Sequence, residues 1–213
     1  VTYAFASNLE SSKDLIYACA RNSVPKVKAA LAAGANPNET QVPATDCRRD
    51  PSLSPTAMEA AMRYAGLEVV KLLIEAGADP NLRSLHTKCM GAAIDKPTPL
   101  VTLVDYIDFD HDPARVLEIV KYLVNHGADP NLSDLNNRSV LGYLIHYKQE
   151  EAFNFLLKHT SVASRQLAFK HLLNDENEPR LADWDTYTKK LLDATVKKEF
   201  NFVCLNYANA DMV

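Results

Sequence analysis

The segment GADPN at residues 77–81 decides the fold, because it recurs twice more along the chain. It returns unchanged at residues 127–131, and residues 34–38 differ from it only by Asn36 in place of the aspartate. Each copy follows a stretch with apolar residues at helical spacing: VPKVKAALAA, GLEVVKLLIEA and RVLEIVKYLVNH. A glycine directly after the last periodic residue is typical of a helix C-terminus. The pattern therefore predicts a chain of repeated units, each closing with a helix and a tight turn.

A second motif opens each unit. TAMEAAMRYAG begins at Thr56, and PTPLVTLVDY contains Thr98; both are variants of the opening T-P-L-H-x-A. Thr56 precedes the closing Gly77 by 21 residues, and the same distance back from Gly34 leads to Lys13 and the expected helix DLIYACAR. A fourth unit opens at Ser139 with SVLGYLIHY and continues as EEAFNFLLKH, but its closing glycine is replaced by Thr160.

With these motifs in register, the chain resembles the ankyrin-repeat family from residue 13 to about residue 160. The resemblance implies an all-α solenoid of stacked helix-turn-helix units, with long finger loops between units and a helical cap at the C-terminal end. We expect an N-terminal extension at residues 1–12 and repeats over 13–161, divided as 13–38, 39–81, 82–131 and 132–161. A divergent repeat or helical cap is expected at residues 162–213.

The spacing of the units departs from the family period of about 33 residues. Gly34 and Gly77 are 43 residues apart, and Gly77 and Gly127 are 50 apart. The first excess lies in ETQVPATDCRRDPSLSP; the second divides between a longer finger around SLHTKCMGAAIDK and an inter-helix loop, IDFDHDPA. An alternative register starts the third repeat at Thr87, which makes TKCMGAAI an extra helical turn, and the sequence leaves both registers open.

The resemblance implies a binding function, with a concave face formed by the finger tips and by the outward positions near the end of each first helix. Tyr and Arg at such positions commonly carry interface energy. An aromatic there can equally stack on the neighbouring repeat, so both interpretations stay open. From these positions and from the fingers we predict the partner-binding residues Arg21, Arg48, Arg49, Arg63, Tyr64, Arg83, His86, Lys88, Asp105, Tyr106, Leu135, Asn136, Arg138, His146 and Tyr147.

The net charge, the apolar segments and the cysteines of the chain indicate which kinds of partner it binds. The net charge of −4 argues against a surface that neutralises nucleic-acid phosphates. No apolar window approaches the roughly 20 residues that a membrane-spanning helix needs, and the opening VTYAFASNLESSKD has no secretory-signal pattern. The four cysteines are scattered, as expected in a reducing, cytoplasmic compartment. We therefore expect another protein as the partner, no nucleic acid, no membrane, and a monomeric chain.

An acidic stretch and the cysteines are the candidates for metal binding or catalysis, and each lacks residues that such a site needs. Residues 108–112 (DFDHD), together with Asp105, match the first alternating ligands of a calcium loop, but Pro113 takes the place of its sharp-turn glycine and Ile119 the place of its bidentate glutamate. The only local candidates for a reactive thiol are Cys89 near His86, and Cys47 beside Arg48 and Arg49, without a family signature around either. Cys19 is expected in the core. We expect no metal, no cofactor and no enzymatic activity.

Two further hypotheses for the function remain open besides a protein-binding module. The chain fits a targeting or regulatory fragment of a larger protein, and, less well, an enzyme that uses Cys89 or residues 108–112. Irregular, expanded repeats of this kind occur in eukaryotic regulators, in poxviral host-range proteins and in effectors that intracellular bacteria deliver into host cells. The chain looks somewhat like the last group, which implies a host-directed effector working in the host cytosol.

Overall fold

The computed structural model describes residues 2–40, 56–83, 98–105, 112–134, 137–174 and 181–196. These ranges contain ten α-helices and no strand, in agreement with the predicted all-α class. The helices are α1 (Thr2–Ala20), α2 (Val24–Ala32), α3 (Ala57–Tyr64), α4 (Leu67–Glu75), α5 (Pro99–Asp105), α6 (Pro113–Asn125), α7 (Val140–His146), α8 (Glu150–Leu157), α9 (Val162–Asn174) and α10 (Leu181–Val196).

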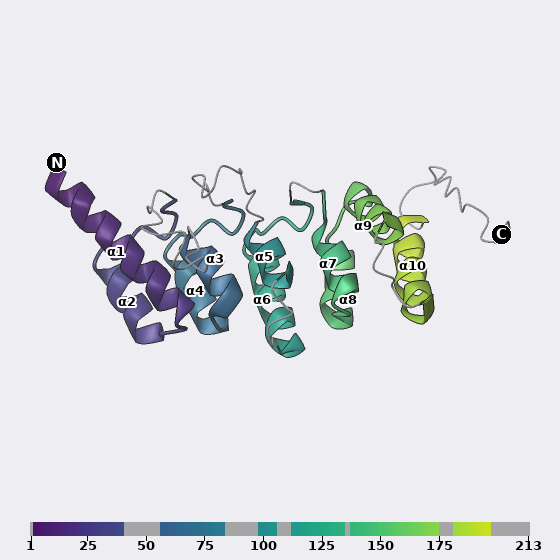
Figure 1. Cartoon of the computed structure of the whole chain (residues 1–213), viewed down its shortest axis with the longest axis horizontal. Helices are drawn as coiled ribbons and strands as arrows, with labels where there is room; N and C mark the ends of the chain where they lie inside the picture. Colours follow the sequence, from purple (N-terminus) through teal and green to yellow (C-terminus); the bar gives the residue numbers. More distant parts are fainter. Residues whose placement is uncertain are drawn as a thin grey trace.

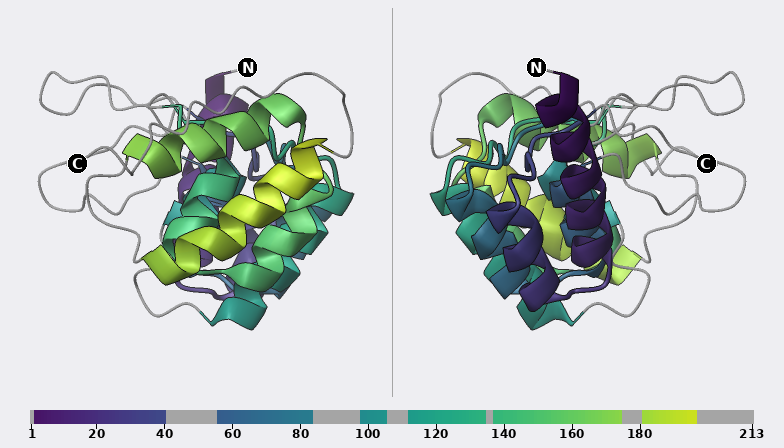
Figure 2. Two further views of the ribbon diagram at one scale, coloured as in Figure 1. Left: turned by 90° about the vertical axis from the view of Figure 1, so that its right-hand side faces the viewer. Right: turned by 90° about the vertical axis from the view of Figure 1, so that its left-hand side faces the viewer.

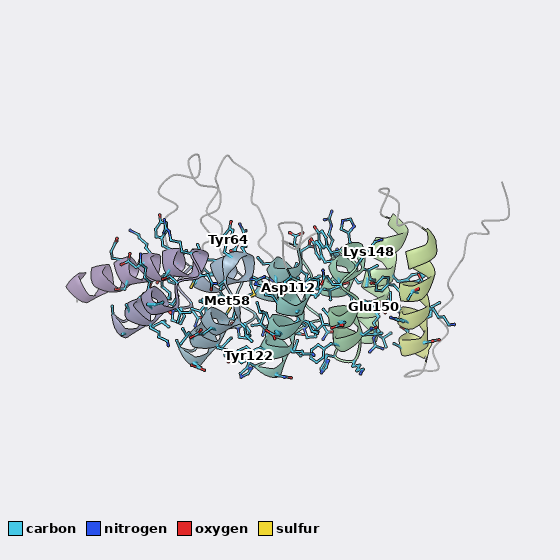
Figure 3. All side chains as sticks on the ribbon, turned by 90° about the horizontal axis from the view of Figure 1, so that it is seen from below. Met58, Tyr64, Asp112, Tyr122, Lys148 and Glu150 are labelled. Atoms are coloured by element: carbon cyan, nitrogen blue, oxygen red, sulfur yellow. The ribbon has the colours of Figure 1, made fainter. Side chains whose placement is uncertain are left out.

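The helices form a row of antiparallel pairs that runs from α1 and α2 at one end to α9 and α10 at the other (Figure 1). First helices pack on first helices along the row, α1 on α3, α3 on α5, α5 on α7 and α7 on α9, while α2, α4, α6 and α8 stack in the same order. Seen along the row, the pairs overlie one another in two layers (Figure 2). Met58, which is 1% exposed, lies between these layers (Figure 3). The apolar faces of successive pairs thus form one continuous core.

Each residue of the repeated pentapeptide has a definite role at the end of its helix pair. Gly77 adopts φ of +87°, which an L side chain rarely adopts, and its amide donates to the carbonyl of Ile74. The next amide, of Ala78, reaches back to Leu73, which completes a Schellman C-cap. Asp79 then turns the chain, because its Oδ1 accepts the amide of Asn81 at 2.8 Å. The glycines of the other copies, Gly34 and Gly127, have φ of +86° and +94°.

The last residue of the pentapeptide connects one pair to the next. Asn81 donates from Nδ2 to the carbonyl of Gly127 at 2.8 Å and accepts the amide of Asp129 on Oδ1, also at 2.8 Å. Asn38 makes the same two bonds, at 2.8 Å each, to Gly77 and Asp79 of the following turn. The Nδ2 and the Oδ1 of each asparagine therefore both form hydrogen bonds with the backbone of the following turn. We call this arrangement the asparagine bridge.

The openings of the units act as N-caps, as their sequence indicates. Thr56 Oγ1 accepts the amide of Glu59 at 3.0 Å, and Ser139 Oγ accepts the amide of Gly142 at 3.2 Å. Thr98 immediately precedes α5 and its Oγ1 lies 3.4 Å from the amide of Val101. The third pair therefore begins where the register based on Thr98 places it. The alternative opening at Thr87 lies outside the described residues.

Two arginines secure helix ends across pairs. Arg115 of α6 donates from Nε to the carbonyl of Ala65 at 2.9 Å and lies 3.3 Å from that of Met62, so it caps the C-terminal end of α3. Arg165 of α9 is only 2% exposed and donates to the carbonyls of Leu157, Thr160 and Ala194. Because Ala194 belongs to α10, this guanidinium joins the C-terminal helices to the fourth pair. Figure 2 shows α9 and α10 lying across this end of the row.

The opposite end of the row carries a polar face. Lys26 of α2 is exposed, whereas the equivalent residues of the second and third pairs, Val69 and Ile119, are fully buried. Asp14 of α1 is likewise exposed where α3 has the buried Ala57. Terminal units of a solenoid need such a polar outer face, because no neighbour covers it. The first pair thus has the chemistry of an end unit.

Helix α1 begins at Thr2, so the extension predicted at residues 1–12 is helical from Thr2 and continues without a break into the helix predicted from Asp14. Residues 2–20 contain neither proline nor glycine, and nothing in the sequence stops the helix there. Within the described ranges, no helix has the length and apolar character to cross a bilayer.

Replacing Asn81 with Ala should lower the free energy of unfolding by about 1–3 kcal/mol, because two bridging hydrogen bonds are lost. Asn81→Asp, which keeps the acceptor and loses the donor, should cost less. The matched control is Asn125→Ala, at the exposed end of α6. Urea unfolding followed by circular dichroism measures all three. Equal stability of the Asn81 and Asn125 alanine variants would contradict the bridge.

Replacing Arg165 with Met should release α10 from the row, since hydrogen bonds from a charged donor contribute about 1.5–3 kcal/mol each to stability. Hydrogen exchange should accelerate across α10 while α3–α6 stay protected. Lys170→Met, on the exposed side of the same helix, is the control. Unchanged protection of α10 in the Arg165 variant would rule out this role.

Candidate functional site

Polar side chains from two first helices and one finger gather on the face of the row formed by α1, α3, α5 and α7, which we call the first-helix face. The group consists of Asp105 at the end of α5, Asp134 and Arg138 on the finger before α7, and Tyr143 and Tyr147 on or next to α7. We call these five residues the Asp105 cluster.

The finger part of the cluster is held in a hairpin. The amide of Asp134 donates to the carbonyl of Arg138 at 3.1 Å, and the amide of Arg138 returns a bond to Asp134 Oδ1 at 2.7 Å. Asn137 adopts φ of +57°, the left-handed conformation that asparagine tolerates in tight turns. The phenol of Tyr143, 6% exposed, donates to Asp134 Oδ2 at 2.9 Å. Burial of that phenol, followed by the nearby carboxylates, raises the pKa of Tyr143.

Asp105 stands between the finger and α7. Its backbone carbonyl accepts the Tyr147 hydroxyl at 3.2 Å, so this tyrosine secures the C-terminal end of α5. The carboxyl group is half-buried. Burial raises the pKa of Asp105, and Asp134 adds to the effect, whereas the positive charges of Arg138 and Arg63 oppose it.

Arg63 is predicted to contact the partner, but its side chain is buried. It is 7% exposed, and its guanidinium lies 2.7 Å from Oε1 of Glu59, which is 3% exposed, one turn earlier on α3. Removing one member of a buried pair leaves the other charge uncompensated, at about 3–5 kcal/mol. The position therefore belongs to the internal packing of α3, a correction that depends on Glu59.

Asp112 and Cys19, two of the residues considered for chemistry, have structural explanations. Asp112 Oδ1 accepts the amide of Ala114 at 3.0 Å, which makes this aspartate the N-cap of α6. Among the described residues, no three His, Cys, Asp or Glu side chains gather as metal ligands would. Cys19 is fully buried, and this burial raises the pKa of its thiol to about 12. The candidates Cys47, Cys89 and residues 108–111 lie outside the described ranges.

A family model for the ankyrin repeat matches residues 56–85 and 98–135. The matched segments contain α3 with α4 and α5 with α6, two of the helix pairs joined by the asparagine bridge. The chain therefore contains ankyrin repeats. No protein in the curated set matches it. Ankyrin repeats are generally protein–protein interaction modules and typically non-catalytic.

The other predicted contacts of this ankyrin-repeat protein are distributed over the first-helix face and one end. Tyr64 is 45% exposed on the first-helix side, opposite Tyr122 of the second-helix side (Figure 3). His146 is exposed, with its ring 4.8 Å from that of Tyr147, and Arg83 donates to the carbonyl of Ser133. Outside the described residues lie Arg48, Arg49, His86, Lys88, Tyr106, Leu135 and Asn136.

Arg21 lies apart from these residues, at the polar end of the ankyrin stack. Its guanidinium sits 5.7 Å from the ring centroid of Tyr17. Both line a groove of about 560 Å³ between α1 and α2, together with Asp14 and Lys26. The side chains expected to point outward near the ends of the first helices therefore differ in their surroundings: Arg21 lies on the end groove, Tyr64 is exposed, and Tyr147 is hydrogen-bonded to α5.

Sequence analysis missed three residues of this surface: Glu59, Asp134 and Tyr143. Glu59 takes the place of the histidine in the opening motif, so its spacing of four from Arg63 was the available signal. Asp134 and Tyr143 meet only because the finger folds back on α7, and the pair Asn136-Asn137 was the only indication of a turn.

Cys19 should resist alkylation in the folded ankyrin protein, because the reactive thiolate is scarce when the pKa is about 12 and the side chain is buried. Iodoacetamide at pH 8, followed by peptide mapping, should leave Cys19 unmodified in buffer and modify it fully in concentrated urea. Fast labelling of the folded protein would show that the α1 packing opens readily.

Proposed function

We propose that the chain binds a partner protein through its first-helix face, with Tyr64, His146 and the Asp105 cluster at the centre of the contact. The general role of ankyrin repeats supports a binding module. The observation that carries the proposal is the exposure of Tyr64: at 45% it is the most exposed large hydrophobic side chain among the described residues, and it lies on the first-helix side. Tyrosines of this kind are frequent hot spots of interfaces.

The fixed finger strengthens this proposal. Asp134 bonds to Arg138 and to Tyr143, so the two sides of the finger base are joined within the chain before any partner arrives. Binding costs less conformational entropy when the loops that make contact are already ordered. The finger tip at residues 135–136, which we predict to touch the partner, is thus carried on a rigid base.

The proposed surface carries both signs of charge. Asp105 is half-buried, Arg138 is exposed on the finger, and His146 is exposed at the C-terminal end of α7. Mixed charge suits a partner segment that also carries both signs, because complementary potentials select the register of binding. A role as a targeting or regulatory fragment of a larger protein would use the same face.

We propose a reducing compartment and a monomeric chain as the working state. Scattered cysteines and the buried, free Cys19 support the cytoplasm, or the host cytosol if the protein is a delivered effector. The polar end face with Lys26 and Asp14 supports a monomer, since that end does not present the apolar stacking face of an internal repeat, and α9 and α10 lie across the other end of the row.

A triple variant, Tyr64→Ala with Arg138→Ala and His146→Ala, should weaken partner binding about 10-fold or more, as the loss of an interface hot spot does. The readout is affinity capture from eukaryotic cytosolic extract, with quantitative mass spectrometry of the bound proteins. Circular dichroism should show unchanged helicity.

The matched control for this experiment is Tyr17→Ala. Tyr17 is 40% exposed and also lies on a first helix, but it borders the end groove. We expect this variant to capture the same proteins as the unmodified chain. Full capture by the triple variant, or equal losses in both, would refute binding through the first-helix face.

A further inference from the structure

Within the Asp105 cluster, Asp105 differs from Asp134 because its carboxylate accepts no hydrogen bond from a described residue. Among the described residues, no group donates a hydrogen bond to its carboxylate and no cation lies within ion-pair distance of it. The neighbouring Asp134 is the contrast, since its carboxylate accepts from the amide of Arg138 at 2.7 Å and from the hydroxyl of Tyr143 at 2.9 Å. Two carboxylates of one cluster therefore differ in that only one is satisfied within the chain.

Three side chains that can carry positive charge act on Asp105: Arg138, Arg63 and His146, whose ring lies 4.8 Å from that of Tyr147. The two arginines are engaged elsewhere. Arg63 contributes charge from a distance, but its guanidinium is bound to Glu59 at 2.7 Å in a buried pair. Arg138 interacts with the hydroxyl and the ring of Tyr143, with its guanidinium 6.0 Å from the ring centroid. Neither has the geometry to serve the Asp105 carboxylate directly.

The position of Asp105 is fixed although its carboxylate is not satisfied. Tyr147 holds the carbonyl of this same residue at 3.2 Å, so the end of α5 cannot turn away to expose the side chain without losing a hydrogen bond. The carboxylate is partly accessible, so water hydrates it in the free protein, but its partial burial still disfavours the charged form. A charged donor supplied by a partner offsets that cost. Groups left unsatisfied by the fold are expected where a protein binds something.

We propose that the partner protein presents an arginine or lysine side chain to the carboxylate of Asp105, between Tyr64 on one side and His146 with Tyr147 on the other. This inference rests on the proposed function and names the chemistry of the partner. A guanidinium suits the position especially well, because its planar fork gives a carboxylate two parallel hydrogen bonds.

The first experiment selects peptides from a random dodecapeptide phage library on the full chain. Peptides enriched on the unmodified protein should share an Arg or Lys. Asp105→Asn should bind them about 10- to 100-fold more weakly, the range for a hydrogen bond between charged groups. Exchange of the shared arginine for citrulline, a neutral isostere, should cause the same loss. Asp14→Asn, an exposed aspartate on the end groove, should bind normally.

The outcomes of the selection separate this inference from the proposed function. Peptides without a cation, lost on Tyr64→Ala and retained on Asp105→Asn, would overturn the inference and leave the first-helix face as the binding site. No enrichment beyond an unrelated control protein would count against both. Equal losses for Asp105→Asn and Asp14→Asn would indicate a general effect of charge and would also overturn the inference.

The second experiment needs no partner. Because the folded protein raises the pKa of Asp105 above its ordinary value of 3.8, ionisation of this group lowers stability as the pH rises through that window. Asp105→Asn should therefore raise the melting temperature at pH 7, and the gain should vanish as the pH falls to about 3.8. A lower melting temperature at pH 7 would mean that the carboxylate is already satisfied.

Arg138 provides the final check, because its charge is the largest favourable influence on Asp105. If this arginine were the missing donor, Asp105→Asn would gain little in the unmodified chain and much more in the Arg138→Gln background, where the carboxylate has lost its partner. We expect a gain in both backgrounds that is only moderately larger without Arg138, as a charge acting from a distance predicts. A gain that appears only in the Arg138→Gln background would assign Asp105 to an internal ion pair and overturn the proposal.

Discussion

The asparagine bridge is the interaction on which the arrangement of the repeats depends. One amide group spans from the turn of one repeat to the backbone of the next, so the length of a single side chain sets the separation of adjacent turns. Everything between a turn and the next opening motif lies outside this connection. The chain can therefore carry long insertions at residues 41–55 and 84–97 while Asn38 and Asn81 keep their repeats in register.

In the fourth repeat, where the closing motif is incomplete, other contacts replace the asparagine bridge. Thr160 stands in the place of the closing glycine, and Asn131 Oδ1 accepts the amide of Ser161 in the next segment at 2.7 Å. Arg165 compensates, because its guanidinium binds the carbonyl of Thr160 and the end of α8. It also binds Ala194 of α10, which an asparagine in the turn does not reach. The loss of the glycine thus coincides with a connection that holds the C-terminal cap.

What the sequence could predict follows from the range of each interaction. The glycine, the turn aspartate and the N-cap threonine act within a few residues, so their spacing alone predicted where helices end and begin. Contacts between repeats depend on how one pair is rotated against the next, which no local pattern encodes. That is why Arg63 was expected at the surface, and why the bond between Tyr143 and Asp134 was not foreseen.

The residues of the first-helix face fall into two groups: some bond within the chain, and others are accessible to a partner. Tyr143 and Tyr147 use their hydroxyl groups to fix the finger and the end of α5, and Arg63 neutralises Glu59 inside α3. The two hydroxyl groups and the Arg63–Glu59 pair are used within the chain, so they position neighbours instead of attracting a partner. The exposed ring of Tyr64 and the carboxylate of Asp105 remain available beside them. A rigid frame around an unsatisfied group favours selectivity, because a partner that lacks the matching donor leaves that group buried without compensation.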